Sequence, residues 1–208
     1  MLSGQALVCV RGERQVFSGL DFTVAPGAGL LLVGPNGSGK SSLLRMIAGL
    51  LAPAAGRLAW QGMDVNDDPQ SHHGRLLFVG HHDPIKPALT VAENLTFWMR
   101  LRGIDVACGD ALSALGLGQL ADQPGRYLSA GQRRRLNLAR LAAIPAPLWL
   151  LDEPTTALDT EAQAALAALM ARHRAGGGLV VASAHGPIGL DGAATLDLGG
   201  LAADEDAA

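Results

Sequence analysis

Apolar positions along the chain follow two different periods, which separate strands from helices. Runs of consecutive apolar residues are typical of strands buried on both faces. Such runs occupy residues 29–33, 148–151 and 179–183, and residues 57–60 and 76–80 are also strand-like. Apolar residues at helical spacing predict a helix from residue 43 that Pro53 stops, and helices also follow Thr90 to about residue 102 and cover residues 130–143 and 160–174. Because buried strands alternate with helices, the pattern predicts an α/β fold with a mostly parallel sheet covered on both faces.

The two ends of the chain and one internal segment differ from this alternation. Residues 5–10 and 20–24 read as short strands joined by a turn at 11–14. Residues from about 92 to 127 lack a buried run and are punctuated by glycine, so we expect a small helical subdomain that Thr90 opens with a capping box. The rest, about 1–91 and 128–208, forms the core of a single domain spanning 1–208. We expect the acidic, Ala-rich residues 202–208 to be a frayed tail.

Composition narrows the class of protein. A chain of 208 residues suits one α/β domain with an insert rather than two complete domains. The net charge of −3 argues against a nucleic-acid partner. We interpret the local exception, Arg133 to Arg135, as a solvated helix face. Cys9 and Cys108 fit no metal-ligand spacing, and we interpret both as reduced thiols of a cytosolic protein.

Membrane-directed segments are not apparent in the sequence. The N-terminus does not combine a basic stretch with an apolar core as a secretory signal does. Apolar runs also stay well below the roughly 18–20 residues that a membrane-spanning helix needs. We therefore expect any association with a membrane to come through a partner.

A glycine-rich loop follows the strand predicted at residues 29–33. Its residues are Gly34, Pro35, Asn36, Gly37, Ser38, Gly39, Lys40, Ser41 and Ser42. The glycines let backbone N–H groups turn inward around phosphates at the positive end of the next helix. At this spacing Lys40 reaches the β- and γ-phosphates of a nucleotide, and the Ser41 hydroxyl is a ligand for Mg²⁺. The pattern predicts that the chain binds a nucleoside triphosphate.

Two carboxylates follow the strand predicted at residues 148–151. Asp152 and Glu153 emerge at the carboxyl end of this strand, which is the usual ligand edge of parallel sheets. Asp152 is suited to hold Mg²⁺ through water. Glu153 points elsewhere and is a candidate general base that polarises the attacking water. Together with the glycine-rich loop, this pair predicts nucleotide hydrolysis.

A second candidate anion site lies far from the first in sequence. Residues 128–132 read Leu-Ser-Ala-Gly-Gln, with Ser129 as an N-cap and Gly131 leaving the backbone approachable at the helix start. With these motifs in this order, the chain resembles the ATP-binding cassette (ABC) family. That family usually has Leu-Ser-Gly-Gly-Gln, and this chain has Ala130 at the first glycine. The resemblance covers almost the whole chain.

The resemblance implies a fold, an activity and a partner. It implies a P-loop NTPase of the ABC type, with an antiparallel β subdomain and a helical insert, that binds ATP and Mg²⁺. In this family the signature of one subunit contacts the γ-phosphate held by the other. Ser129, Gly131 and Gln132 would therefore serve the partner's ATP in a head-to-tail homodimer. His185 matches the histidine that contacts the γ-phosphate, and residues 156–159 match the loop at the dimer seam.

Two positions depart from the family pattern. The family has Gln where this chain has His82, and an imidazole is a poor direct ligand for Mg²⁺, although it can bond to a coordinated water. The family also stacks an aromatic residue on adenine, where this chain has Arg11, whose guanidinium plane offers a less specific stack. His82 leaves open an alternative in which ATP clamps the dimer without being hydrolysed.

A narrower resemblance concerns one subfamily. Residues 80–95, the signature with Ala130, and residues 135–141 are similar to the ATP-binding subunits of bacterial heme exporters used in cytochrome c maturation. This implies a peripheral subunit on the cytoplasmic face of the inner membrane, whose integral membrane partners contact the region near residues 82–98. An exporter of another substrate, such as a lipid or drug, is the alternative.

Some residues near these motifs admit two interpretations. Phe97 and Trp98 either form part of the surface that the membrane partners contact or fill the core of the helical subdomain. We interpret His72 and His73, in a polar loop, as solvated rather than as a metal or heme site. The chain itself offers no heme ligand in a membrane pocket.

Overall fold

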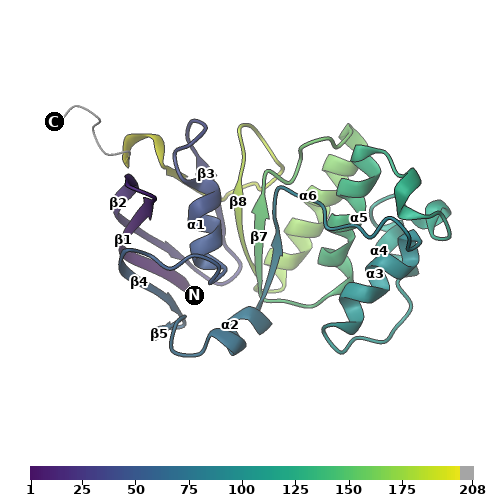
Figure 1. Ribbon diagram of the computed structural model, residues 1–208, viewed down its shortest axis with the longest axis horizontal. Coiled ribbons are helices and arrows are strands. Elements are labelled where there is room, and N and C mark those ends of the chain that lie inside the picture. The colour runs from purple at the N-terminus through teal and green to yellow at the C-terminus, as the bar shows by residue number, and fades with distance from the viewer. Residues whose placement is uncertain (202–208) are drawn as a thin grey trace.

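Two sheets and several helices are stacked in layers along the long axis of the molecule (Figure 1). The structure, a computed structural model, describes residues 1–201. Within this range, nine strands form one antiparallel and one parallel sheet. The predicted tail at residues 202–208 lies outside the described residues. In the described part of the chain, none of the helices combines the length and apolar character needed to cross a bilayer.

The parallel sheet forms the centre of the fold. Among residues 1–201 its strands have the order β6 (Leu76–Val79), β7 (Leu148–Asp152), β8 (Leu179–Ser183), β3 (Gly29–Val33) and β9 (Ala194–Asp197). The pairings between neighbours are all parallel, so the carboxyl ends of the strands meet at one edge. The sequence pattern does not predict β9, because this edge strand is mostly exposed and lacks an apolar run.

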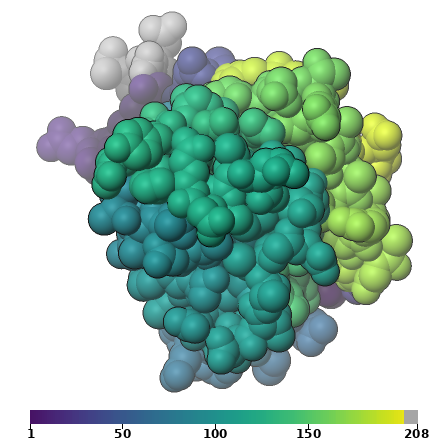
Figure 2. All heavy atoms as spheres, turned by 90° about the vertical axis from the view of Figure 1, so that its right-hand side faces the viewer, coloured from purple at the N-terminus to yellow at the C-terminus, as the bar shows by residue number. Residues whose placement is uncertain are grey.

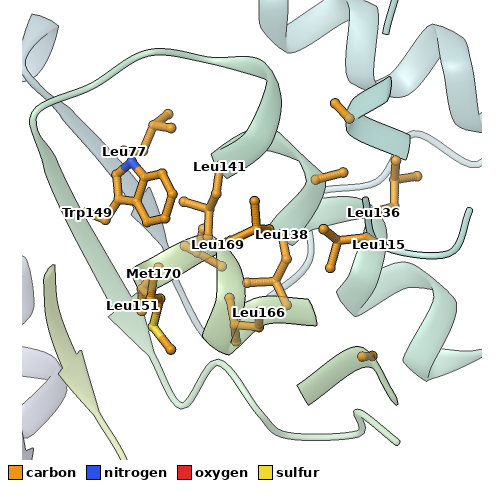
Figure 3. Close-up of a cluster of buried hydrophobic side chains, with 14 of the residues drawn as sticks. Leu77, Leu115, Leu136, Leu138, Leu141, Trp149, Leu151, Leu166, Leu169 and Met170 are labelled. Carbon is orange, nitrogen blue, oxygen red and sulfur yellow. The ribbon is translucent and has the colours of Figure 1, made fainter. Parts of the chain in front are cut away.

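Alternate side chains of β7 enter two different cores. Leu148 and Leu150 belong to the core that contains α1 (Lys40–Ile47). Trp149 and Leu151 belong to the opposite core, shared with α5 (Ala130–Ala143) and α6 (Thr160–Ala175) (Figure 3). Since helices cover both faces, the predicted doubly covered sheet is confirmed.

The helix α1 is shorter than the apolar spacing suggests. It ends at Ile47 and not near Pro53, because Gly49 takes a left-handed φ of 72° that closes the helix. Leu50, just beyond this turn, is 61% exposed. Leu50 is therefore an apolar residue on the surface and does not mark the core face of a longer helix.

The antiparallel sheet lies beyond α1, on the side away from the parallel sheet (Figure 1). Its strands have the order β2 (Arg14–Val24), β1 (Leu2–Arg11), β4 (Ala55–Trp60) and β5 (Met63–Asp64). The predicted hairpin turn is confirmed, but both strands are longer than predicted. Irregular register in β1, with Ala6 at a φ of 46°, breaks the apolar alternation on which the prediction depends.

The segment between β6 and α5 is helical, as predicted. It contains α3 (Val91–Arg100), α4 (Gly109–Ser113) and 3₁₀ turns at Gly118–Leu120 and Gly125–Tyr127. The capping box of Thr90 and Glu93 is present. Teal and green atoms of this part of the chain form the face in Figure 2. Because α3 and α4 pack against α5, the segment shares the core on the helical side of the sheet.

Two short helices complete the described chain. A 3₁₀ turn covers Gly199–Leu201, and α2 (Pro69–Gly74) starts after the N-cap Asp68. His72 lies in α2 and is only 1% exposed, with its Nε2–H donating to the Ile47 carbonyl at 2.7 Å. The prediction of a solvated His72 is therefore wrong, because the end of α1 supplies an acceptor for its ring. His73 is exposed, as predicted.

The two cysteines lie in different layers. Cys9 belongs to the core with α1 and the antiparallel sheet, and Cys108 to the core on the helical side. Both thiols are buried and free. This agrees with the interpretation of two separate reduced cysteines.

Candidate ATP-binding and hydrolysis site

The glycine-rich loop joins the end of β3 to the start of α1. Gly34, Gly37 and Gly39 have φ angles of 132°, 83° and 102°, a region that residues with a side chain rarely adopt. A Cβ atom on Gly39 would lie 2.7 Å from Val16. The loop can therefore follow this path only with glycine at these positions.

Lys40 extends back across this loop from the first turn of α1. Its Nζ donates to the carbonyl oxygens of Gly34 at 2.7 Å and Pro35 at 2.9 Å. The residue is only 6% exposed. The ammonium group is thus held inside the curve of the loop, close to the positive end of the helix dipole. The local charge suits a polyphosphate.

Asp152 lies where three elements meet. It ends β7 and is 6% exposed. Its Oδ1 accepts from the hydroxyl of Ser41, in α1, at 3.0 Å and from the hydroxyl of Ser183, in β8, at 2.7 Å. Mg²⁺ prefers hard oxygen ligands and usually keeps several waters. A carboxylate beside a serine hydroxyl fits that preference, so the predicted metal pair Ser41 and Asp152 is chemically suitable.

Glu153 follows directly but points in another direction. Its φ of 46° is left-handed, which is strained for a residue with a side chain. Its backbone N–H donates to Ser183 Oγ at 3.0 Å, and its Oε1 lies 3.1 Å from Nε2 of His185. His185 comes just after β8 and is half exposed. The structure thus brings together two side chains that are 32 positions apart.

Two cavities surround these residues. The first, of about 440 Å³, is lined by the glycine-rich loop together with Arg11 and Glu153. The second, of about 470 Å³, is lined by Asp152 and His82, among others. Ser41 is part of both walls. Both Arg11 and His82 therefore lie on the site where the sequence predicts them, although their roles stay predictions.

The first cavity also contains an arginine that the sequence analysis does not single out. Arg14 is the cross-strand partner of Arg11 at the end of the β1–β2 hairpin, and both line the cavity. The position of Arg14 could have been predicted from the sequence of the hairpin turn. A two-residue loop at Gly12 and Glu13 places the flanking residues opposite each other.

The signature segment forms a compact helix start. Ser129 Oγ accepts from the Gln132 N–H at 3.2 Å, and Gln132 Oε1 accepts from the Ser129 N–H at 2.8 Å. A Cβ on Gly131 would lie 2.8 Å from the Ala157 carbonyl, so glycine allows close approach of the 156–159 loop. Of the described residues that line the two cavities, none belongs to residues 128–132.

The arginine run that follows the signature does not have a uniform environment. Arg133 is exposed, as predicted. Arg134 is only 3% exposed and bonds to backbone carbonyls at the carboxyl ends of β6 and β7. The prediction of a solvated face is therefore wrong for Arg134. Its position on α5 turns the side chain toward carbonyl groups that the sheet leaves available.

Comparison with known proteins gives the family. The family described as ABC transporter matches residues 17–156. The chain belongs to this family. It is 58% identical to the cytochrome c biogenesis ATP-binding export protein CcmA of Rhodospirillum rubrum, over 98% of this chain and 88% of that protein. It is 53% identical to the protein of the same name from Paramagnetospirillum magneticum, over 98% and 96% of the two chains.

Solved structures agree on the fold. A putative ABC transporter ATP-binding protein from Pyrococcus furiosus has a TM-score of 0.84 at 23% identity, covering 97% of this chain and 99% of that one. A dimeric ATP-binding cassette in a post-hydrolysis state with ADP and Pi has a TM-score of 0.80 at 24% identity, covering 96% and 95%. The predicted ABC-type α/β fold is confirmed. The chain is an ATP-binding ATPase subunit of an ABC transporter.

Proposed function

We propose that this ATPase drives a bacterial heme exporter of cytochrome c biogenesis, using ATP with Mg²⁺. The names of two relatives that are more than half identical support the biological process. The similarity of residues 80–95 to heme-exporter subunits supports the substrate. The proposal that the chain hydrolyses ATP rests on the geometry of the site. Ser41 meets Asp152, and His185 meets Glu153, at one edge of the parallel sheet.

In the proposed mechanism, the chain binds the polyphosphate before it activates water. Backbone N–H groups of residues 36–42 surround the phosphates, and Lys40 turns from its two carbonyl partners to the β- and γ-phosphates. Ser41 and Asp152 would hold Mg²⁺, which neutralises charge on the phosphate oxygens. Arg11 provides a flat surface for the base.

Glu153 then acts as the general base. Its carboxylate takes a proton from the water whose oxygen attacks the γ-phosphorus, while the bond to the ADP oxygen breaks. His185 holds one carboxylate oxygen through its Nε2 and so fixes the side chain. His82, which lines one cavity together with Asp152, would bond to a water rather than directly to Mg²⁺.

A second copy of the chain completes the site in this proposal. Its Ser129, Gly131 and Gln132 would face the γ-phosphate at the positive end of α5. The separation of residues 128–132 from the cavities of their own protomer supports an arrangement across a homodimer. Nucleic acid has no part in it.

The membrane partners would contact the region of residues 82–98. An apolar hollow of about 570 Å³ lies on α3, with Phe97 in its wall. Leu101, also in the wall, is 62% exposed. Trp98 instead packs against the core. Phe97 therefore fits the interpretation of a docking surface, and Trp98 fits that of a core residue. The hollow supports a peripheral subunit docked on integral membrane subunits at the cytoplasmic face of the inner membrane.

Substitution of Glu153 tests the hydrolytic mechanism. Glu153→Gln keeps the shape of the side chain but removes the base, so turnover should fall by at least about 100-fold while MgATP binding persists. Steady-state hydrolysis and equilibrium nucleotide binding measure the two effects. Lys40→Ala is the matched comparison, because it should weaken nucleotide binding itself. If the parent hydrolyses ATP and the Gln variant does so at the same rate, the assignment is refuted.

The same measurement distinguishes ATP hydrolysis from a second candidate function. An exposed imidazole at position 82, where the family has an amide, favours a clamp that binds ATP without hydrolysing it. In that case the parent protein would hydrolyse ATP no faster than its Glu153→Gln variant, and both would dimerise with ATP.

A further inference from the structure

Arg134 is a buried cation whose N–H groups all have acceptors. A guanidinium has five such donors. Three go to the carbonyl oxygens of residues 152–154, at 2.8, 2.9 and 3.3 Å. The other two go to the Gly80 carbonyl at 2.8 Å and to Asp83 Oδ1 at 3.2 Å. No other side chain offers enough donors in this planar arrangement to satisfy the same set.

The location of these acceptors explains why an arginine is needed. The ladder between β6 and β7 ends at the pair Val79 and Leu151. The next carbonyl along each chain, at Gly80 and at Asp152, bonds to Arg134 instead. A buried carbonyl without a partner destabilises the fold. The guanidinium therefore joins the two strand ends where the sheet itself stops joining them.

The loop after β6 is fixed to α5 at a second point. Asp83 accepts from Arg134 and also from Nδ2 of Asn137, at 2.8 Å, one turn further along α5. The Asp83 side chain is 19% exposed, so the ion pair is largely shielded from water. A movement of the loop at residues 80–84 must therefore either carry Arg134 with it or break these bonds.

We propose that Arg134 is the positioning residue of the catalytic turn and that its ion pair with Asp83 links the 80–84 loop to Glu153. This inference rests on the proposed role of Glu153 as general base. The left-handed φ of Glu153 persists only where neighbours fix it. Ser183 holds its N–H, and Arg134 holds its C=O. Release of either end moves the carboxylate relative to the attacking water.

Arg134→Lys tests the positioning role. Lysine keeps the charge but offers three donors and no plane, so the carbonyls of the turn lose their common anchor. Because a small misplacement of a catalytic group is costly, kcat for ATP should fall by at least about tenfold. The KM for ATP should stay within about twofold, since the glycine-rich loop is untouched. Arg133→Lys, at the exposed neighbouring position, is the control and should match the parent.

Asp83→Asn tests the link to the loop. It removes the ion pair but leaves the four carbonyl contacts of Arg134, so kcat should fall by a smaller factor. Because Asp83 acts on the turn through Arg134, while its bond with Asn137 stays on α5, the double variant should be no slower than Arg134→Lys alone. Additive losses in the double variant would overturn the link.

Two outcomes would overturn the positioning role, and both differ from a failure of the proposed mechanism. One is a parent-like kcat in Arg134→Lys. The other is an equal loss of kcat and nucleotide affinity, which a purely structural role would produce. In either case Glu153→Gln should still be inactive. If the Glu153→Gln variant is active, the proposed general base itself is wrong.

Discussion

Glu153 combines a strained backbone with a fixed carboxylate. Its left-handed φ turns the chain sharply after β7, which separates its side chain from that of Asp152 although the two residues are adjacent. One carboxylate therefore meets Ser41, and the other meets His185. The left-handed backbone of Glu153 thus allows two adjacent carboxylates to face different partners, as the two proposed roles in hydrolysis require.

His72 makes the stability of the fold depend on pH. Burial lowers its pKa, and the charges of His73 and Arg75 lower it further, against the opposing effect of the Ile47 carbonyl. Protonation therefore favours the unfolded chain. The stabilisation is present above the ordinary histidine pKa of about 6.5 and is lost as the pH falls below it.

His72→Gln should reduce this dependence. The loss of one titrating group lowers the slope of the unfolding free energy by up to about 1.4 kcal/mol per pH unit. Urea unfolding between pH 7.5 and 5.5 measures it, and His73→Gln, at the exposed neighbour, is the control. His173 also has a pKa lowered by burial, so part of the slope remains. An unchanged slope in His72→Gln would contradict this explanation.

Single residues show where sequence interpretation succeeds and where it fails. The positions of Lys40, Asp152 and Glu153 are predictable because the glycine-rich loop and the strand end are marked in the sequence, whereas their chemical roles stay predictions. Arg134 and His72 are misread because polar residues in a polar stretch suggest solvent. Their burial depends on carbonyls of Gly80 and Ile47, which only the tertiary fold brings near.

The start of α5 is stabilised by the residues of its first turn. The capping box of Ser129 and Gln132 satisfies the N–H groups of the helix start, and Gly131 lets the Ala157 carbonyl approach. Ala157 itself has a φ of 62°, so the loop opposite is also constrained. The orientation of the signature and that of the 156–159 loop are therefore coupled within one protomer.

Gly131→Ala tests this coupling. The added Cβ meets a backbone oxygen at 2.8 Å, and such overpacking costs about 1–3 kcal/mol. The helix start and the loop must move apart, so ATP turnover should fall by at least about tenfold. The matched control is Ala130→Gly, which restores the usual family residue at an exposed position and should stay within about twofold of the parent. Equal activity of both variants would contradict the coupling.

Elements with strong periodic signals are predictable from the sequence. The helix at 130–143 and the strand at 179–183 have the predicted bounds, because a capping residue or an apolar run marks them. The edge strand at 194–197 and the short helix at 69–74 are not predicted. Neither buries a continuous apolar face, so each depends on contacts from the rest of the fold.

Across the whole molecule, a continuous path of bonded groups leads from the apolar hollow on α3 to the site. Asn94 of α3 is buried and holds the loop before it, through contacts with Lys86, Leu89 and Thr90. The same loop continues back to Asp83 and so to Arg134. A displacement of α3, as the proposed docking would produce, should therefore reach the turn at residues 152–154 through bonded groups.

In the proposed homodimer, the signature of one protomer completes the phosphate loop of the other. Asn36 and Ser129 are both exposed and belong to these two segments. A variant with cysteine at both positions, in a Glu153→Gln background that should keep MgATP bound, can be treated with a short bifunctional thiol reagent and MgATP. We expect a covalent dimer that requires ATP and both cysteines. Cross-links confined to single chains, in a dimer that ATP has closed, would contradict the proposal.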